Sequence, residues 1–252
     1  EMWNPIGIIG CITAFNFPFA VFGWNLTLAM ICGDLTMWKP APTTPLITIA
    51  FMKIIDEVFK ECNVPQGVVT CCLGGKTIGE LIVNDKRMEL VSFTGSTAVG
   101  KKVSEVVHKR FGKTILELGG NNAAIIMDDA DLDNCIKSCL FGAAGTCGQR
   151  CTTLRRMLIH EKVYDEVVQR LLKAYPTIPI GDPLDPKTLV GPLHYKHAVD
   201  EYKKGLEEIQ KQGGKILYGG KTLEDKFPGG HYVLPTIVEI DQKTAPIVKE
   251  EL

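Results

Sequence analysis

The stretch Val-Ser-Phe-Thr-Gly-Ser-Thr-Ala-Val-Gly at residues 91–100 decides the fold of this chain. Its apolar start is typical of a buried strand, and a glycine turn leads from there into a segment with helical spacing. Gly95 and Gly100 leave room for a ligand, while Ser96 and the free amides at a helix start suit phosphate oxygens. The alternative is a plain helix cap, because the stretch is neither G-x-G-x-x-G nor a Walker loop.

Strand and helix patterns alternate on both sides of this stretch. Apolar runs at 6–15, 35–39, 68–72, 90–94 and 114–118 alternate with helix-period segments at 19–32, 45–62, 78–83 and 99–110. This order predicts an α/β fold with a parallel sheet covered by helices on both faces.

The pattern restarts after the glycine pair at 119–120. Strands are predicted at 123–127, 155–160, 215–218 and 233–240, and helices at 131–144, 163–175 and 196–212. We therefore expect a parallel-sheet, Rossmann-like domain at residues 1–120 and a second α/β domain at residues 121–252.

Composition narrows the class of protein. The chain has 252 residues, 45% hydrophobic and 23% charged, with a net charge of -1. These values are ordinary for a globular protein and favour neither a nucleic-acid nor a membrane partner. The nine cysteines, odd in number and without a C-x-x-C pair, indicate thiols in a reducing compartment rather than disulfides or a metal site.

The ends of the chain carry no predicted targeting segment. The start at Glu1 has no basic region of a signal peptide, and the apolar stretch at 17–32 is too polar and too short to span a membrane. Because the first residue is not Met, we expect a piece of a longer protein.

Cys151 and Glu117 form the main catalytic hypothesis. Cys151 follows Gly-Gln-Arg, and these backbone-rich surroundings favour an exposed, reactive thiol, whereas nearby Cys147 lacks this sequence before it. Glu117 lies in an apolar strand, so we expect a buried carboxylate with the raised pKa that a general base needs. The alternatives are one more buried cysteine and a glutamate satisfied by backbone amides.

Asn16 and Lys39 are further candidates. Asn16 lies between a predicted strand and helix, where its amide could donate to a developing oxyanion, although a turn or cap asparagine is the simpler interpretation. Lys39 ends a predicted parallel strand, where open α/β sheets bind ligands. The alternative for Lys39 is a solvated charge. The five histidines show no metal spacing.

Together these motifs resemble the NAD(P)-dependent aldehyde dehydrogenase superfamily. Phe-Asn-Phe-Pro at 15–18, Trp-Lys-Pro at 38–40, Gly-Ser-Thr-x-x-Gly at 95–100, Leu-Glu-Leu-Gly-Gly at 116–120 and Gly-Gln-x-Cys at 148–151 occur in that family's order and spacing. The wider sequence is similar to the antiquitin branch, the α-aminoadipic semialdehyde dehydrogenases. The likeness covers essentially the whole chain and implies a truncated aldehyde dehydrogenase fold.

The resemblance implies a reaction. Cys151 would attack the aldehyde, while Asn16 and the Cys151 amide hold the oxyanion. Hydride would pass to NAD, leaving a thioester, and Glu117 would activate the water that hydrolyses it. Arg150 would bind a substrate carboxylate, which guanidinium geometry favours, with Thr152 beside it. This implies an acidic semialdehyde of lysine catabolism as substrate.

The resemblance also implies cofactor contacts. Lys39 would bind the adenosine ribose and Glu251 the nicotinamide ribose. The remaining contacts would come from Thr13, Phe15, Gly79, Gly95 and Ser96. Many relatives carry an NAD-selecting glutamate where this chain has Pro42, but antiquitin-like members share the proline, so NAD is the expected cofactor.

Two stretches of the family are missing from the sequence, one before Glu1 and one after Leu252. The second carries the family's oligomerisation strand, and the resemblance implies a homotetramer of the full-length protein in the cytoplasm, with mitochondria as a second compartment. Alternatives are a truncated, non-catalytic binding or structural protein, a cysteine hydrolase or acyltransferase, and a CoA-acylating dehydrogenase. A hydrolase would need a histidine beside the thiol.

Overall fold

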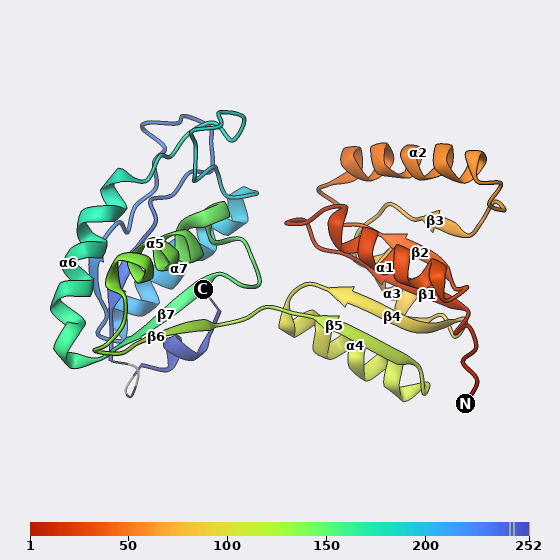
Figure 1. Ribbon diagram of the computed structural model, residues 1–252, viewed down its shortest axis with the longest axis horizontal. Coiled ribbons are helices and arrows are strands. Elements are labelled where there is room, and N and C mark those ends of the chain that lie inside the picture. Colours follow the sequence, from red (N-terminus) through yellow and green to blue (C-terminus); the bar gives the residue numbers. More distant parts are fainter. Residues whose placement is uncertain (242, 244, 252) are drawn as a thin grey trace. The chain divides into compact units, whose positions relative to one another are not determined.

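In the computed structural model, residues 1–241, 243 and 245–251 are described. The chain separates into two units, Glu1–Gly119 and Gly120–Leu252. Both mix helices and strands, and each has its own hydrophobic core (Figure 1).

The first unit is built on a five-stranded sheet whose strands are all parallel. Its strands are β1 (Ile8–Ile12), β2 (Leu35–Lys39), β3 (Val69–Cys71), β4 (Met88–Thr94) and β5 (Lys113–Glu117), in the order β3-β2-β1-β4-β5. The chain builds outward from β1 in one direction and then crosses over to β4. This is the strand order of a doubly wound dinucleotide-binding fold with five of its six strands.

Helices cover both faces of this sheet, as predicted. The helices are α1 (Ala20–Ile31), α2 (Pro45–Glu61), α3 (Lys76–Asn84) and α4 (Thr97–Lys109). Buried side chains of α1 and α2 pack on one face and those of α3 and α4 on the other. Figure 1 shows α2 and α4 on opposite sides of the strands.

Trp38 of β2 is the centre of the α1–α2 face. It is fully buried, stacks on Phe22 with ring centroids 4.1 Å apart, and meets the edge of Phe51 at 6.2 Å. Its indole Nε1 donates a 2.9 Å hydrogen bond to Thr13 Oγ1, which satisfies the one polar atom of the ring.

Two glycines let the helices of the other face approach the sheet. A Cβ on Gly10 of β1 would lie 2.7 Å from Ile82 Cγ2 of α3. A Cβ on Gly100 of α4 would lie 2.4 Å from Leu118 Cδ2. Gly100 is buried, so it serves helix–sheet packing, and the prediction that it leaves room for a ligand is wrong.

The second unit contains two small sheets. Strands β6 (Asn122–Ile126) and β7 (Leu154–Ile159) pair in parallel, and β8 (Lys215–Tyr218) and β9 (Ile237–Glu239) pair antiparallel. Helices α5 (Leu132–Ala144) and α6 (Tyr164–Ala174) contribute to a core that includes Ile126. Helix α7 is Lys196–Lys211, and 3-10 turns cover Gly145–Gly148, Glu161–Val163, Tyr175–Thr177 and Pro246–Lys249.

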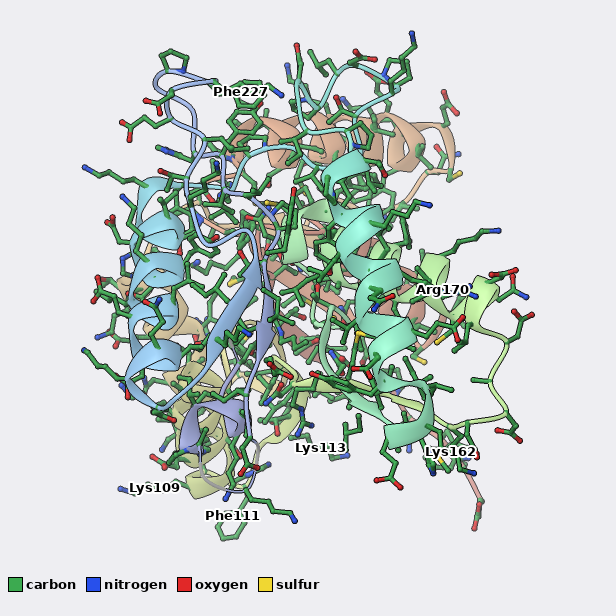
Figure 2. All side chains as sticks on the ribbon, turned by 90° about the vertical axis from the view of Figure 1, so that its left-hand side faces the viewer. Lys109, Phe111, Lys113, Lys162, Arg170 and Phe227 are labelled. Carbon is green, nitrogen blue, oxygen red and sulfur yellow. The ribbon has the colours of Figure 1, made fainter. Side chains whose placement is uncertain are left out.

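Charged side chains occupy the outside of this unit. Arg170 of α6 pairs with Asp133 and Glu166, and Lys162 pairs with Asp128; Figure 2 shows Arg170 and Lys162 projecting outward. Asp131 caps α5 as predicted, accepting from the amide of Asp133 at 3.1 Å. No helix among the described residues has the length and apolarity that a membrane span requires.

Two predicted strands are shorter than expected. The strand predicted at 6–15 is Ile8–Ile12, because Gly7 has a φ of 118° and the chain bends before Pro18. The strand predicted at 233–240 is Ile237–Glu239, preceded by an isolated bridge between Thr222 and Val233. Pro235 lies between them, and a proline has no amide for the ladder.

Trp38 should contribute far more to stability than Trp24, an exposed tryptophan of α1. We expect Trp38→Ala to lower the free energy of unfolding by about 3–5 kcal/mol, because it leaves a cavity and orphans the Thr13 hydroxyl. Trp24→Ala, at a side chain 53% exposed, should cost less than about 1 kcal/mol. Urea unfolding followed by circular dichroism measures both, and equal losses would contradict this account of the core.

Candidate functional site

The carboxyl edge of the parallel sheet brings together predicted residues that are far apart in sequence. Thr13 follows β1, Lys39 ends β2, Gly95 follows β4 and Glu117 ends β5. The Thr13 amide donates to the Lys39 carbonyl at 3.1 Å, and the Gly95 amide donates to the Glu117 carbonyl at 3.0 Å. Four of the predicted positions therefore share one edge of the first unit.

Lys39 is buried at this edge, with 6% of its surface exposed, so its interpretation as a solvated charge is wrong. Its Nζ donates to the Pro40 carbonyl at 3.0 Å, and burial lowers the pKa of the ammonium. Gly79 of α3 lies alongside, because a Cβ there would come within 3.8 Å of Lys39 Cδ. A buried lysine is rare unless it has a partner, and a ligand hydroxyl is a suitable one.

The N-terminus of α4 is arranged as an anion site. Ser96 is the N-cap and its hydroxyl accepts from the Val99 amide at 3.4 Å, while Ser96 itself is exposed. A Cβ on Gly95 would lie 2.6 Å from Phe93 Cζ, so only glycine fits this turn. The first amides of the helix lack partners within the helix and favour a phosphate. Lys39 and this turn thus place an ammonium group and free helix amides at the same edge of the sheet.

Glu117 is exposed, and the expectation of a buried carboxylate is wrong. It is the last residue of β5, an edge strand in which exposure alternates along the chain. Leu116 and Leu118 pack into the α3–α4 core, so Glu117 points to the opposite side. The carboxylate is therefore accessible at the end of its strand.

Other predicted side chains of the first unit differ in exposure. Thr13 is buried, and its hydroxyl accepts the hydrogen bond from Trp38, so it is committed to the core. Phe15 and Asn16 are half-buried in the bend between β1 and α1. Pro42 is exposed just beyond the strand that carries Lys39.

In the second unit, Cys151 follows a strained turn. Three successive residues adopt left-handed backbone angles, with φ of 54° at Thr146, 56° at Cys147 and 70° at Gly148. Such angles are unfavourable for a β-branched threonine and cluster at functional sites. Cys151 is exposed, as predicted, whereas Cys147 is half-buried and burial raises its pKa to about 11.

The turn at residues 150–153 is closed from within. The Thr153 amide donates to the Arg150 carbonyl at 3.1 Å, and the Arg150 amide donates to Thr153 Oγ1 at 3.2 Å. Gln149, the residue just before this turn, is anchored by its side chain, whose Oε1 accepts a hydrogen bond from the His194 amide at 2.8 Å. Cys151 thus lies on a turn whose backbone is fixed on one side.

Arg150 lies against the end of α5. Its Nη2 donates to the Phe141 carbonyl at 3.1 Å and its guanidinium lies 5.1 Å from the Phe141 ring centre. Its buried Nε has no hydrogen-bond partner among the described residues. Thr152, the second predicted substrate contact, is exposed.

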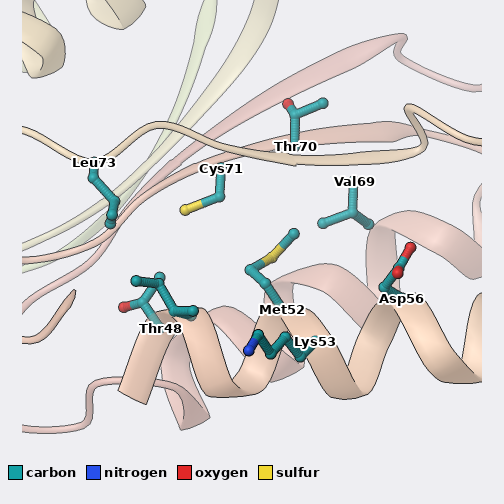
Figure 3. Close-up of a pocket in the computed structure, with 9 residues that line it drawn as sticks. Thr48, Met52, Lys53, Asp56, Val69, Thr70, Cys71 and Leu73 are labelled. Carbon is teal, nitrogen blue, oxygen red and sulfur yellow. The ribbon is translucent and has the colours of Figure 1, made fainter. Parts of the chain in front are cut away.

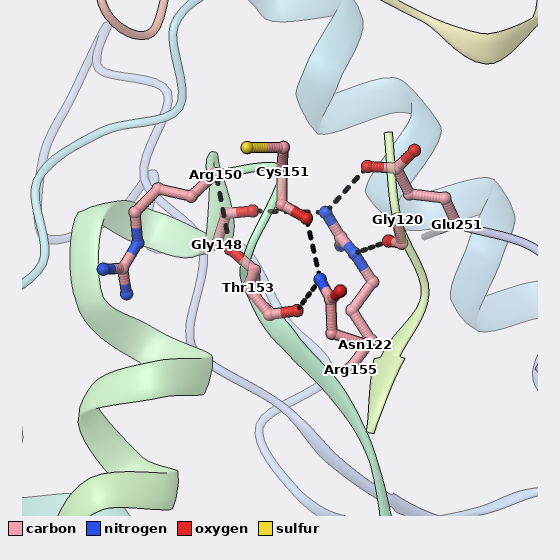
Figure 4. Close-up of polar contacts among 8 residues, drawn as sticks. All are labelled: Gly120, Asn122, Gly148, Arg150, Cys151, Thr153, Arg155 and Glu251. Carbon is pink, nitrogen blue, oxygen red and sulfur yellow. Dashed lines mark hydrogen bonds and ion pairs between the residues drawn. The ribbon is translucent and has the colours of Figure 1, made fainter. Parts of the chain in front are cut away.

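Asn122 and Arg155 contact the segment around Cys151 and were not singled out from the sequence (Figure 4). Asn122 Nδ2 donates to the carbonyls of Cys151 at 2.7 Å and Thr153 at 3.0 Å. Arg155 donates to the Gly120 carbonyl at 3.0 Å and forms an ion pair with Glu251 at 3.1 Å. The available signals were an asparagine pair after a glycine pair and an arginine pair four residues after Cys151.

A separate pocket of about 510 Å³ lies between α2 and β3 (Figure 3). Its lining includes Met52 and Asp56 of α2 and Val69 and Cys71 of β3. None of the predicted site residues lines it.

Comparison with known proteins identifies the family. The model of the aldehyde dehydrogenase family matches residues 1–252. The chain is 55% identical over its whole length to aldehyde dehydrogenase family 7 member B4 of Arabidopsis thaliana, covering 49% of that protein. It is 51% identical to α-aminoadipic semialdehyde dehydrogenase of Mus musculus, covering 46% of that protein. The chain thus spans about half the length of these curated relatives.

Solved structures of aldehyde dehydrogenases have the same fold as this chain. Betaine aldehyde dehydrogenase of Staphylococcus aureus, in complex with NAD⁺, superposes with a TM-score of 0.93 at 29% identity, over 98% of this chain and 48% of that one. The glyceraldehyde-3-phosphate dehydrogenase GapN of Methanocaldococcus jannaschii, complexed with NADP, gives 0.90 at 32% identity, over 98% and 52%. The chain belongs to the aldehyde dehydrogenase family.

Proposed function

We propose that the protein oxidises an aldehyde to a carboxylate with NAD, through a covalent intermediate on Cys151. The observation that carries this proposal is the exposed Cys151 on a turn fixed by backbone hydrogen bonds, beside a Cys147 that burial keeps protonated. A thiolate is the reactive form of a cysteine, and access decides which thiol meets a substrate.

In the proposed reaction, Cys151 Sγ attacks the aldehyde carbon to give a thiohemiacetal. The oxyanion that develops is held by the Asn16 side-chain amide and the Cys151 backbone amide. Bound NAD would accept the hydride from the carbon of the thiohemiacetal, and the loss of this hydride leaves a thioester on Cys151. Glu117 then takes a proton from the water that cleaves the thioester, a role that suits its accessible position at the end of β5.

Several residues are proposed to hold NAD. Lys39 binds the adenosine ribose beside Gly79, the turn at Gly95 and Ser96 binds the pyrophosphate, and Glu251 binds the nicotinamide ribose. Phe15 contributes to the cofactor channel from the end of β1, and Thr13 does so through its backbone, because Trp38 binds its hydroxyl. What supports NAD is the NAD⁺ complex of the bacterial neighbour, while the NADP complex of the archaeal one keeps the second cofactor as the alternative.

An acidic semialdehyde is the proposed substrate class. The relatives named as α-aminoadipic semialdehyde dehydrogenases support it, as does Arg150, whose buried Nε still has a free donor. A substrate carboxylate near this guanidinium, with Thr152 beside it, would form charge-assisted hydrogen bonds. A protein that binds such ligands without turning them over is the second candidate.

Thiol labelling should separate Cys151 from Cys147. At pH 8 we expect iodoacetamide to alkylate Cys151 in the native chain and to leave Cys147 unmodified. A thiol with a pKa of about 11 is only about one part in a thousand thiolate at that pH. Peptide mass spectrometry after quenching measures both sites. Cys147 should become reactive in urea, and native labelling of Cys147 at the rate of Cys151 would contradict the assignment.

Cys151→Ser should abolish aldehyde-dependent NADH formation, lowering kcat by roughly a thousandfold or more, because a serine hydroxyl is a far weaker nucleophile. Absorbance of NADH with α-aminoadipic semialdehyde measures turnover. Quenching of tryptophan fluorescence during titration with NAD should show unchanged cofactor binding. Cys147→Ala, the matched control, should retain turnover. If the wild-type chain binds NAD but forms no NADH, the non-catalytic candidate is favoured.

Arg150→Ala should raise KM for an acidic semialdehyde by roughly tenfold or more, because it removes the charged partner of the substrate carboxylate. KM for a neutral aldehyde of the same length should change less than about threefold, since that aldehyde has no carboxylate for the guanidinium to bind. Steady-state NADH kinetics with both substrates measure the ratio. Equal effects on the two aldehydes would remove Arg150 from substrate recognition.

A further inference from the structure

The carbonyl groups of the nucleophile turn are held by one side chain. Asn122 is the first residue of β6, and its Nδ2 lies 2.7 Å from the Cys151 carbonyl oxygen and 3.0 Å from that of Thr153. A side-chain amide nitrogen carries two N–H groups, so each carbonyl receives one. Both donors of Asn122 are therefore used on the turn that carries the thiol (Figure 4).

We propose that Asn122 is a positioning residue for Cys151: by fixing the peptide planes that follow Cys151 and Thr153, it holds the turn in the conformation that directs the Cys151 backbone amide where an oxyanion requires it. This rests on the proposed role of Cys151 as the nucleophile. Asn122 itself touches neither substrate nor cofactor in this proposal, and it acts through the backbone of the turn.

The contacts around the two Asn122 hydrogen bonds support this role. The turn is closed on its inner side by the hydrogen bonds between Arg150 and Thr153, and Thr153 is only 3% exposed. Asn122 adds the outer anchor and ties the turn to β6, where it pairs in register with Leu154 of β7. The turn is thereby joined to a sheet rather than to a loop, and sheets hold side chains more rigidly.

The approach of residues 120–122 to the turn is close and specific. A Cβ on Gly120 would lie 2.9 Å from the Cys151 carbonyl oxygen, so only glycine allows this packing. Arg155 holds the Gly120 carbonyl at 3.0 Å and the Gly148 carbonyl at 3.5 Å, which fixes the ends of both segments. The Asn122 amide is thus presented to the turn from a constrained position.

The proposal separates two reactions of the same thiol. Attack on an ester or aldehyde creates an oxyanion and depends on the direction of the Cys151 amide, because a misplaced donor no longer meets the charge. Displacement of iodide from iodoacetamide creates no oxyanion and depends on thiol access alone. A positioning residue should therefore change acylation much more than alkylation.

The test compares these two rates in the 252-residue chain without cofactor. With p-nitrophenyl acetate, Cys151 Sγ forms a bond to the carbonyl carbon, the bond to p-nitrophenolate breaks, and the thiol proton passes to solvent. The burst of p-nitrophenolate reports acylation, and iodoacetamide labelling read by mass spectrometry reports alkylation. We expect Asn122→Ala to slow acylation by about 10- to 100-fold and alkylation less than about threefold.

Asn121 provides the matched control. Its Nδ2 donates to the Val248 carbonyl at 2.7 Å, so Asn121→Ala removes a similar hydrogen bond that does not reach the turn. Both rates should stay at the wild-type level in this variant. Asn122→Ser retains one donor and should recover part of the acylation rate, whereas Asn122→Asp loses its donors and should not. Thermal unfolding verifies that each variant is folded.

The outcomes distinguish this inference from the proposed function. If wild-type chain shows a burst that Cys151→Ser abolishes, and Asn122→Ala acylates at the wild-type rate, the role of Asn122 is overturned and that of Cys151 stands. If Asn122→Ala slows both reactions equally, its effect is a general loss of structure and the positioning role is overturned. If the wild-type chain shows no burst that depends on Cys151, both proposals fall together.

Discussion

The parallel register of the five-stranded sheet is the constraint on which the first unit depends. Because every strand runs in the same direction, β1, β2, β4 and β5 must end at one edge, and the residues that follow them meet there. The hydrogen bonds from Thr13 to Lys39 and from Gly95 to Glu117 align the carboxyl ends of the neighbouring strands. Inside the core, Trp38 stacks on Phe22 and donates a hydrogen bond to Thr13, and these contacts hold β2 in that register.

In the second unit, the corresponding constraint is the rigidity of the exposed turn at residues 150–153. A turn that offers its thiol to solvent has few apolar contacts, so its backbone polar groups must be bound by side chains. Asn122 binds the Cys151 carbonyl and Arg155 the Gly148 carbonyl, while Glu251 balances the arginine charge. Gln149 joins the same segment to the rest of the unit by accepting a hydrogen bond from the His194 amide. The left-handed angles from Thr146 to Gly148 are tolerated because these contacts fix the segment that follows them.

Periodicity predicted most of the elements and the division near residues 119–120, because strand and helix spacing are properties of neighbouring residues. The side on which an isolated residue faces was harder to predict. Glu117 was expected inside from its apolar neighbours, yet alternation in an edge strand turns it outward, and Gly100 faces Leu118 rather than a ligand. Asn122 escaped notice because its partners, the carbonyls of Cys151 and Thr153, are backbone atoms that no sequence motif reveals.

Exposure alone does not explain why Cys151 would be the reactive thiol, since Cys32 and Cys62 are exposed as well. Those two cysteines are the C-caps of α1 and α2. Cys151 ends no helix, and the carbonyls of its own turn are bound by Asn122 and directed toward β6. Burial separates Cys151 from a second group, since it raises the thiol pKa of Cys11, Cys71, Cys139 and Cys147.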